Sequence, residues 1–100
     1  MASDLLEKVI EQMTKAGLPL AGRFPFKPKL TTNRRGDLII DKQSTTKGPK
    51  RGKKGFVDEQ GRIWIKDHPH AGLPTHWDVQ IGGGAEYIRV DQNGNEIPNS

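Results

Sequence analysis

The motif His76-Trp77-Asp78-Val79-Gln80 places an imidazole, a carboxylate and an amide at alternate positions of the chain. In an extended strand alternate side chains share a face, so the motif predicts one polar face and one apolar face. A histidine and an aspartate about 7 Å apart on a strand, two residues at roughly 3.3 Å each, can move protons in general acid–base catalysis. The same alternation is equally typical of the solvent-facing side of a half-buried antiparallel strand.

The three histidines of the chain lie within nine positions, His68, His70 and His76, in a stretch that also contains Asp67 and Asp78. Prolines at two positions of the intervening loop restrict its backbone, so His68 and His70 could be held over the polar face of the motif. This clustering makes His70 the candidate for a second acid–base group.

Three chemistries could use such a face. His68, His70, His76 and Asp78 are suitable metal ligands, although the chain has no cysteine thiolate. Metal-independent RNA cleavage would use a base for the ribose 2′-hydroxyl, a cation or amide at the phosphate, and an acid for the leaving oxygen. A non-catalytic basic module, binding RNA or protein, would use the histidines and tryptophans only as contacts.

The strand after the motif could complete the polar face. If residues 86–90 pair antiparallel with the motif through the glycine-rich loop, Tyr87 and Arg89 share one face. Ile88 and Val90 would then join Trp77 on the core side. We therefore expect Trp77 in the core, whereas Trp64 could be a core residue or a stacking platform.

Charge divides the chain into two halves. Residues 1–54 hold 13 Lys/Arg and 5 Asp/Glu, a net charge of +8, whereas residues 55–100 hold 3 and 7, a net charge of −4. The basic half culminates between positions 47 and 54 in a run broken by glycine and proline, which predicts a loop rather than a helix. Such a loop suits phosphate backbones, and the alternative is a solvated linker. The basic residues expected to contact RNA are Lys47, Lys50, Arg51, Lys53, Lys54 and Lys66.

The elements that must position these residues form a simple series. Asp4 to Ala16 has the apolar spacing of an amphipathic helix, with Ser3 or Asp4 as N-cap and Gly17 as its end. Residues 18–36 are rich in proline and predict an irregular connection. One short strand is expected at 38–40, followed by a basic loop over 42–54.

From Gly55 onward the pattern is strand and turn. Residues 56–57 and 62–66 predict one β-hairpin, and 86–90 with 95–97 a second, each with a glycine in its turn. The strand at 76–81 lies between them. The fold class expected is α+β: a short N-terminal amphipathic helix packed on a twisted antiparallel sheet of four to five strands.

Length and composition limit the possibilities. A chain of 100 residues with 32 % hydrophobic residues predicts a single domain, 1–100, with a small core, and the absence of cysteine excludes disulfides. No apolar run approaches the roughly 20 residues that span a bilayer, so membrane insertion is not expected. The N-terminus lacks a signal-peptide pattern. We expect that a larger toxin or a secretion machine would carry the domain out of the cell that made it.

The second half of the chain resembles a known class of domains. The segments concerned are Lys53-Lys54-Gly55-Phe56-Val57-Asp58, Gly61-Arg62-Ile63-Trp64, the His/Pro/Gly loop, the 76–80 motif, Tyr87 and the Asn93-Gly94 turn. Together they are similar to the C-terminal toxin domains of bacterial polymorphic toxins. The resemblance implies a ribonuclease delivered into competing cells and paired with an immunity protein.

A weaker similarity connects Trp77-Asp78-Val79-Gln80, with Tyr87 and Arg89, to the ribosome-inactivating colicin ribonucleases. In that pattern the catalytic aspartate falls on Asp78. The histidine of the colicin pattern falls on Ile81. The glutamate of that pattern aligns with Glu86 only if the glycine loop is one residue different in length. His76 or His70 would therefore have to replace that histidine.

Together these observations predict an antibacterial endoribonuclease that needs no cofactor or metal and acts in the cytoplasm of the target bacterium. Its partners would be RNA and a small acidic immunity protein in a heterodimer. The alternatives are a non-catalytic basic RNA-binding or adaptor module and a metal-dependent nuclease. The predicted catalytic residues are His76, Asp78, His70, Gln80, Tyr87 and Arg89.

Overall fold

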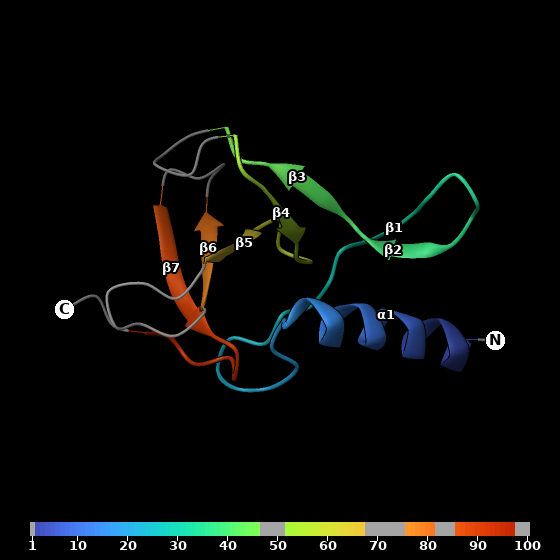
Figure 1. Cartoon of the computed structure of the whole chain (residues 1–100), viewed down its shortest axis with the longest axis horizontal. Coiled ribbons are helices and arrows are strands. Elements are labelled where there is room, and N and C mark those ends of the chain that lie inside the picture. Colours follow the sequence, from blue (N-terminus) through green and yellow to red (C-terminus); the bar gives the residue numbers. More distant parts are fainter. Residues whose placement is uncertain (1, 47–51, 68–75, 82–85, 98–100) are drawn as a thin grey trace.

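The computed structural model describes residues 2–46, 52–67, 76–81 and 86–97, with side chains from residue 7 onward (Figure 1). Within these ranges it contains one helix and two antiparallel sheets, which confirms the α+β class and the sheet of about five strands. Strands β1 and β2 form the small sheet, and the large sheet has the order β3-β4-β5-β6-β7. The elements are α1 (Ala2–Ala16), β1 (Leu30–Thr32), β2 (Leu38–Ile40), β3 (Lys42–Ser44), β4 (Lys54–Val57), β5 (Ile63–Asp67), β6 (His76–Ile81) and β7 (Glu86–Asp91).

Helix α1 ends where the sequence predicts and begins earlier. It starts at Ala2, so Ser3 and Asp4 lie inside the helix and the prediction that one of them is the N-cap is wrong. At the C-terminus Gly17 has a φ of 79°. Its N–H donates to the carbonyl of Thr14 (3.1 Å), and the N–H of Leu18 donates to that of Met13 (2.9 Å). These two bonds form a Schellman motif, in which glycine takes the left-handed conformation.

The helix packs against both sheets through a narrow apolar stripe. Val9 and Met13 are buried in the main core, whereas Ile10 is exposed. The side chain of Gln12 ties the helix to β2, because its amide donates to the carbonyl of Leu38 (3.1 Å) and accepts from the N–H of Ile40 (3.3 Å). No helix in the described ranges has the length and apolarity to cross a membrane.

Two segments expected to be irregular contain strands. Leu30–Thr32, within the proline-rich connection, forms β1 and pairs with β2. Its residues follow the last proline at position 28, so their N–H groups are all available for pairing. Lys42–Ser44, within the expected basic loop, forms β3 and pairs with β4. Lysine on the edge strand of a sheet is common because it discourages further pairing.

The remaining strands agree with the sequence pattern. Strands β4 and β5 form the first predicted hairpin, with Gly61 at a φ of 81° in the turn, and β6 covers 76–81 as expected. Strand β7 forms the first arm of the second hairpin. Its expected second arm, 95–97, makes only an isolated bridge between Val90 and Glu96.

Both tryptophans belong to the core on the helix side of the large sheet. Trp64 and Trp77 have exposed fractions of 0 % and 1 %. Phe26 packs edge-on against Trp64 at a centroid distance of 5.2 Å, and Phe56 packs against Trp77 at 6.1 Å. The indole of Trp77 donates to the carbonyl of Gly17 (3.0 Å). The prediction for Trp77 is confirmed, and Trp64 is a core residue rather than an exposed stacking platform.

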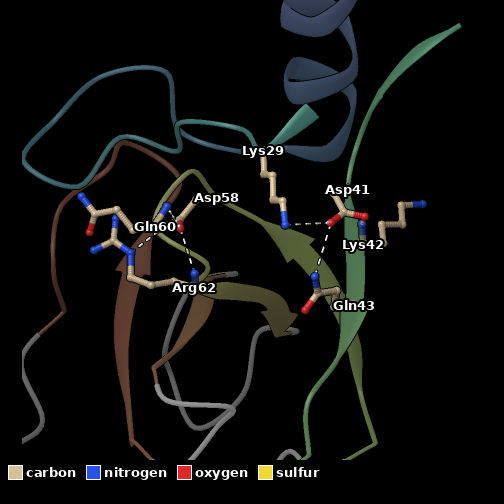
Figure 2. A network of polar contacts seen from close by, with 7 residues as sticks. All are labelled: Lys29, Asp41, Lys42, Gln43, Asp58, Gln60 and Arg62. Atoms are coloured by element: carbon tan, nitrogen blue, oxygen red, sulfur yellow. Dashed lines mark hydrogen bonds and ion pairs between the residues drawn. The ribbon is translucent and has the colours of Figure 1, made fainter. Parts of the chain in front are cut away.

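Two aspartates organise the region where the sheets meet (Figure 2). The carboxylate of Asp41, between β2 and β3, accepts hydrogen bonds from the N–H of Lys42 (3.0 Å) and the side-chain amide of Gln43 (3.4 Å). It also forms an ion pair with Lys29 (3.8 Å). Asp58, in the β4–β5 turn, is almost fully buried and binds the backbone and side chain of the same turn. Both carboxylates are therefore used to build the scaffold.

The close packing of the Asn93-Gly94 turn against the backbone of Ala21 can be tested directly. Gly94 has a φ of 81°, and a Cβ atom there would lie 1.9 Å from the carbonyl oxygen of Ala21. Gly36 has a φ of 83° and open space around it. We expect Gly94→Ala to lower the free energy of unfolding by at least about 2 kcal/mol more than Gly36→Ala, because only the former adds a clash to the backbone strain. Urea unfolding of both variants measures the difference, and equal losses would contradict the close approach.

Candidate active site

The face of the large sheet opposite the helix gathers the polar residues of three strands. Directly paired residues of an antiparallel sheet share a face, and β6 is paired with β5 on one side and β7 on the other. His76 therefore lies between Asp67 and Asp91, and Asp78 between Ile65 and Arg89. Gln80 lies between Ile63 and Tyr87. The predicted sharing of one face by the motif, Tyr87 and Arg89 is confirmed.

This face is buried, and the interpretation of it as a solvent-facing side is wrong. His76, Asp78 and Gln80 have exposed fractions of 0 %, 2 % and 1 %. Val57, Ile63 and Ile65 form a second apolar cluster on the same side of the sheet. The polar residues of the motif thus lie beside a small apolar cluster, where electrostatic interactions are stronger than in water.

His76 lies between two carboxylates. Its Nε2 atom is 3.4 Å from Oδ2 of Asp67 and 3.5 Å from Oδ1 of Asp78. The side chain of Asp67 is 21 % exposed, so this corner of the site reaches the surface. An imidazole held between carboxylates has a fixed ring orientation, which proton transfer requires.

Asp67 is the site residue that sequence reasoning missed. It is the last residue of β5, and His76 is the first residue of β6, so the two are partners at the end of one antiparallel pair. The signal was present in the sequence, because two strands joined by a loop bring the residues that flank the loop together. Asp67 can be identified from the sequence only if β5 and β6 are assumed to be neighbours in the sheet.

A cation also lies near the carboxylate of Asp78. The Nε atom of Arg89 is 3.9 Å from Oδ1 of Asp78, and the arginine side chain is 26 % exposed. Tyr87 is partly buried next to Gln80. Neither amide atom of Gln80 has a hydrogen-bond partner in the described part of the chain. A buried amide without a partner costs about 1–3 kcal/mol.

Several predicted residues lie elsewhere. Lys66 is on the helix side, with Nζ 5.9 Å from the ring centre of Trp77 and 3.3 Å from the carbonyl oxygen of Ala16. Lys54 shares the helix-side face of β4 with Phe56 and lines a groove of about 630 Å³ beside the helix. Ile81 and Glu86, the positions of the colicin histidine and glutamate, pair with each other on that same side.

Lys53 is exposed next to β4. The remaining predicted residues lie outside the described ranges, namely His68, His70, Lys47, Lys50 and Arg51.

Comparison with protein family models, curated proteins and solved structures finds no match to this chain.

Proposed function

We propose that the chain is an antibacterial endoribonuclease toxin domain that cleaves RNA by metal-independent acid–base transesterification. The observation that carries the proposal is the position of the buried His76 imidazole, 3.4–3.5 Å from two carboxylates, on the face that also presents Arg89. A base, its orienting carboxylates and a cation are the groups that this reaction needs.

In the proposed reaction His76 takes the proton of a ribose 2′-hydroxyl, whose oxygen attacks the adjacent phosphorus. The bond from phosphorus to the 5′-oxygen breaks, which leaves a 2′,3′-cyclic phosphate, and an acid protonates the departing 5′-oxygen. Asp78 orients the imidazole, and Arg89 stabilises the charge on the phosphorane. Gln80 and Tyr87 contact the scissile phosphate. His70 remains our candidate for the acid.

The burial of these groups is compatible with catalysis because the site has an exposed rim. Asp67 and Arg89 keep about a fifth to a quarter of their side chains exposed, at opposite sides of the buried motif. RNA bound at this rim would bring its phosphate to Arg89, and the buried residues would act in a water-poor environment where fixed charges have larger effects.

A non-catalytic RNA-binding module is the less favoured alternative. Such a module would stack bases on exposed aromatic side chains. In this fold Trp64 and Trp77 are buried in the core and are not available for stacking.

Cleavage in the presence of a chelator tests the proposal. We expect purified protein to cut bacterial RNA in excess EDTA and to leave 2′,3′-cyclic phosphate ends, because the reaction needs only side-chain acids and bases. Mapping of the RNA ends by sequencing, with and without removal of the cyclic phosphate, provides the measurement. Cleavage that stops in EDTA and returns with added magnesium or zinc would replace the proposal with a metal-dependent nuclease.

RNA would be held mainly by charge. Lys53, exposed beside β4, and Lys54 and Lys66, on the helix side, are proposed to contact phosphates, together with Lys47, Lys50 and Arg51. Such contacts release counterions, so the affinity should fall as the salt concentration rises. The logarithm of the binding constant should fall linearly with the logarithm of the salt concentration, with a slope of roughly −0.7 for each phosphate contact with a single strand.

The proposed partner is a small acidic immunity protein that forms a heterodimer with this basic domain before a larger toxin or secretion machine delivers it. Acidic side chains at the phosphate positions would give fast and salt-sensitive association. We expect bacteria that express the chain alone to stop growing and those that co-express the adjacent gene to grow normally. Normal growth with the unmutated chain alone, at a high level, would argue against a toxin.

A further inference from the structure

The three side chains around His76 have the types and spacing of a metal site. Asp67, His76 and Asp78 each offer one ligand atom, and these atoms all lie within 4.8 Å of one another. They come from the paired ends of β5 and β6, so the backbone of the sheet holds two of the three in place. His76 and Asp78 are almost fully buried, and Asp67 is partly exposed.

The separations at Nε2 of His76 allow the three side chains to share one ion. Nε2 of His76 lies 3.4 Å from Oδ2 of Asp67 and 3.5 Å from Oδ1 of Asp78. Ligand atoms bound tetrahedrally to zinc, with bonds of roughly 2.1 Å, are about 3.4 Å apart. The two separations at Nε2 agree with this value, and the third, between the carboxylates, is within 4.8 Å.

The ligand set selects among cations. One imidazole and two carboxylates suit Zn²⁺, which accepts nitrogen and oxygen ligands in a four-coordinate site. Mg²⁺ prefers six oxygen ligands in an octahedral arrangement and keeps its waters, so it fits poorly here. Arg89, on β7, lies 3.9 Å from the same Oδ1 atom of Asp78 and adds no metal ligand, since a guanidinium has no acceptor atom.

We infer that Asp67, His76 and Asp78 bind one Zn²⁺ ion and that this ion switches the site off. A neutral imidazole has one acceptor nitrogen. Zinc bound at Nε2 would use that acceptor and leave the ring proton on Nδ1, so the ring could not take the 2′-hydroxyl proton. Zinc binding and base catalysis by His76 are then mutually exclusive. The binding depends only on the geometry, whereas the inhibition rests on the proposed ribonuclease activity.

Zinc binding is measured on the metal-stripped full chain by competition with a chromophoric zinc chelator. We expect one zinc per chain and no comparable binding of magnesium. Asp67→Asn and His76→Gln should each weaken the zinc affinity on the order of 100-fold or more, because even the loss of outer partners of a metal site costs roughly 10–100-fold. Asp37→Asn, which changes an exposed carboxylate away from the site, should bind zinc as the unmodified chain does.

Because His76 is buried, its variant is checked for folding by circular dichroism. The partly exposed Asp67 provides the decisive variant. A chain that binds no zinc, or an Asp67→Asn variant that binds it with unchanged affinity, would overturn the metal site. Zinc should also raise the melting temperature of the unmodified chain, since a ligand of the native state stabilises it.

Cleavage assays separate this inference from the proposed function. Zinc that binds and slows cleavage, with recovery on chelation, supports both. Zinc that binds and is required for cleavage upholds the site but overturns its inhibitory role and the metal-independent mechanism. A chain that binds no zinc yet cleaves RNA in EDTA overturns the site alone. A zinc-loaded chain that cleaves at full rate overturns the inhibition and the role of His76 as base.

Discussion

His76→Gln and Asp78→Asn are each expected to lower RNA cleavage by on the order of 10²-fold or more, because each removes part of one proton-transfer unit. Glutamine and asparagine keep much of the original shape, which matters for side chains exposed by no more than 2 %. The double variant should be hardly slower than the worse single variant, since groups that act together show non-additive losses. Single-turnover cleavage of a mapped RNA substrate measures all three.

The matched control for this series is Asp37→Asn, whose carboxylate is exposed and far in sequence from the motif. It should cleave RNA at a rate close to that of the unmodified chain. Thermal unfolding shows whether each variant is folded. If folded His76→Gln and Asp78→Asn both cleaved within a few-fold of the unmodified rate, the site assignment would be wrong.

Asp58→Ala is expected to lower the free energy of unfolding by about 3–5 kcal/mol, because it removes one partner of a buried and charged network. The carboxylate of Asp58 accepts from the N–H groups of Gln60 (3.0 Å) and Arg62 (2.9 Å), from Nε of Arg62 (2.7 Å) and from the indole of Trp64 (3.0 Å). Without it the fully buried indole N–H of Trp64 loses its acceptor. Figure 2 shows how the turn closes around this carboxylate.

Urea unfolding followed by tryptophan fluorescence measures this loss. Glu59→Ala is the control, since Glu59 is adjacent and exposed, and a surface change of this kind stays within about 0.5 kcal/mol. A small domain has roughly 5–15 kcal/mol of total stability, so Asp58→Ala should remove a large fraction of it. Equal stability of the two variants would show that the turn does not depend on the buried carboxylate.

Replacement of two aspartates with similar burial is thus expected to have different consequences. Asp58 is 1 % exposed and Asp78 is 2 % exposed. The first is surrounded by donors of its own turn, so its loss should reduce stability. The second lies beside a histidine of its own strand and an arginine of β7, so its conversion to asparagine should reduce cleavage. Burial alone does not separate a structural carboxylate from one proposed to be catalytic, and the proposal rests on the identity of its neighbours.

The sequence by itself determined the features that depend on neighbouring residues. The alternation from His76 to Ile81 predicted the strand and its two faces, and Gly61 predicted the turn of the first hairpin. Gly17 marked the end of the helix because only a residue without a side chain takes the left-handed conformation easily. Each of these follows from spacings of a few residues along the chain.

Only the tertiary structure decided which strands are neighbours and what surrounds each face. It brought Asp67 to His76, placed Lys66 on the face opposite the site, and buried a polar face that the alternation could equally assign to solvent. It also added β1 and β3, short strands whose residues pair because distant segments offer partners. Strand order and burial depend on contacts between residues far apart in the chain, and a local pattern of period two is compatible with several such arrangements.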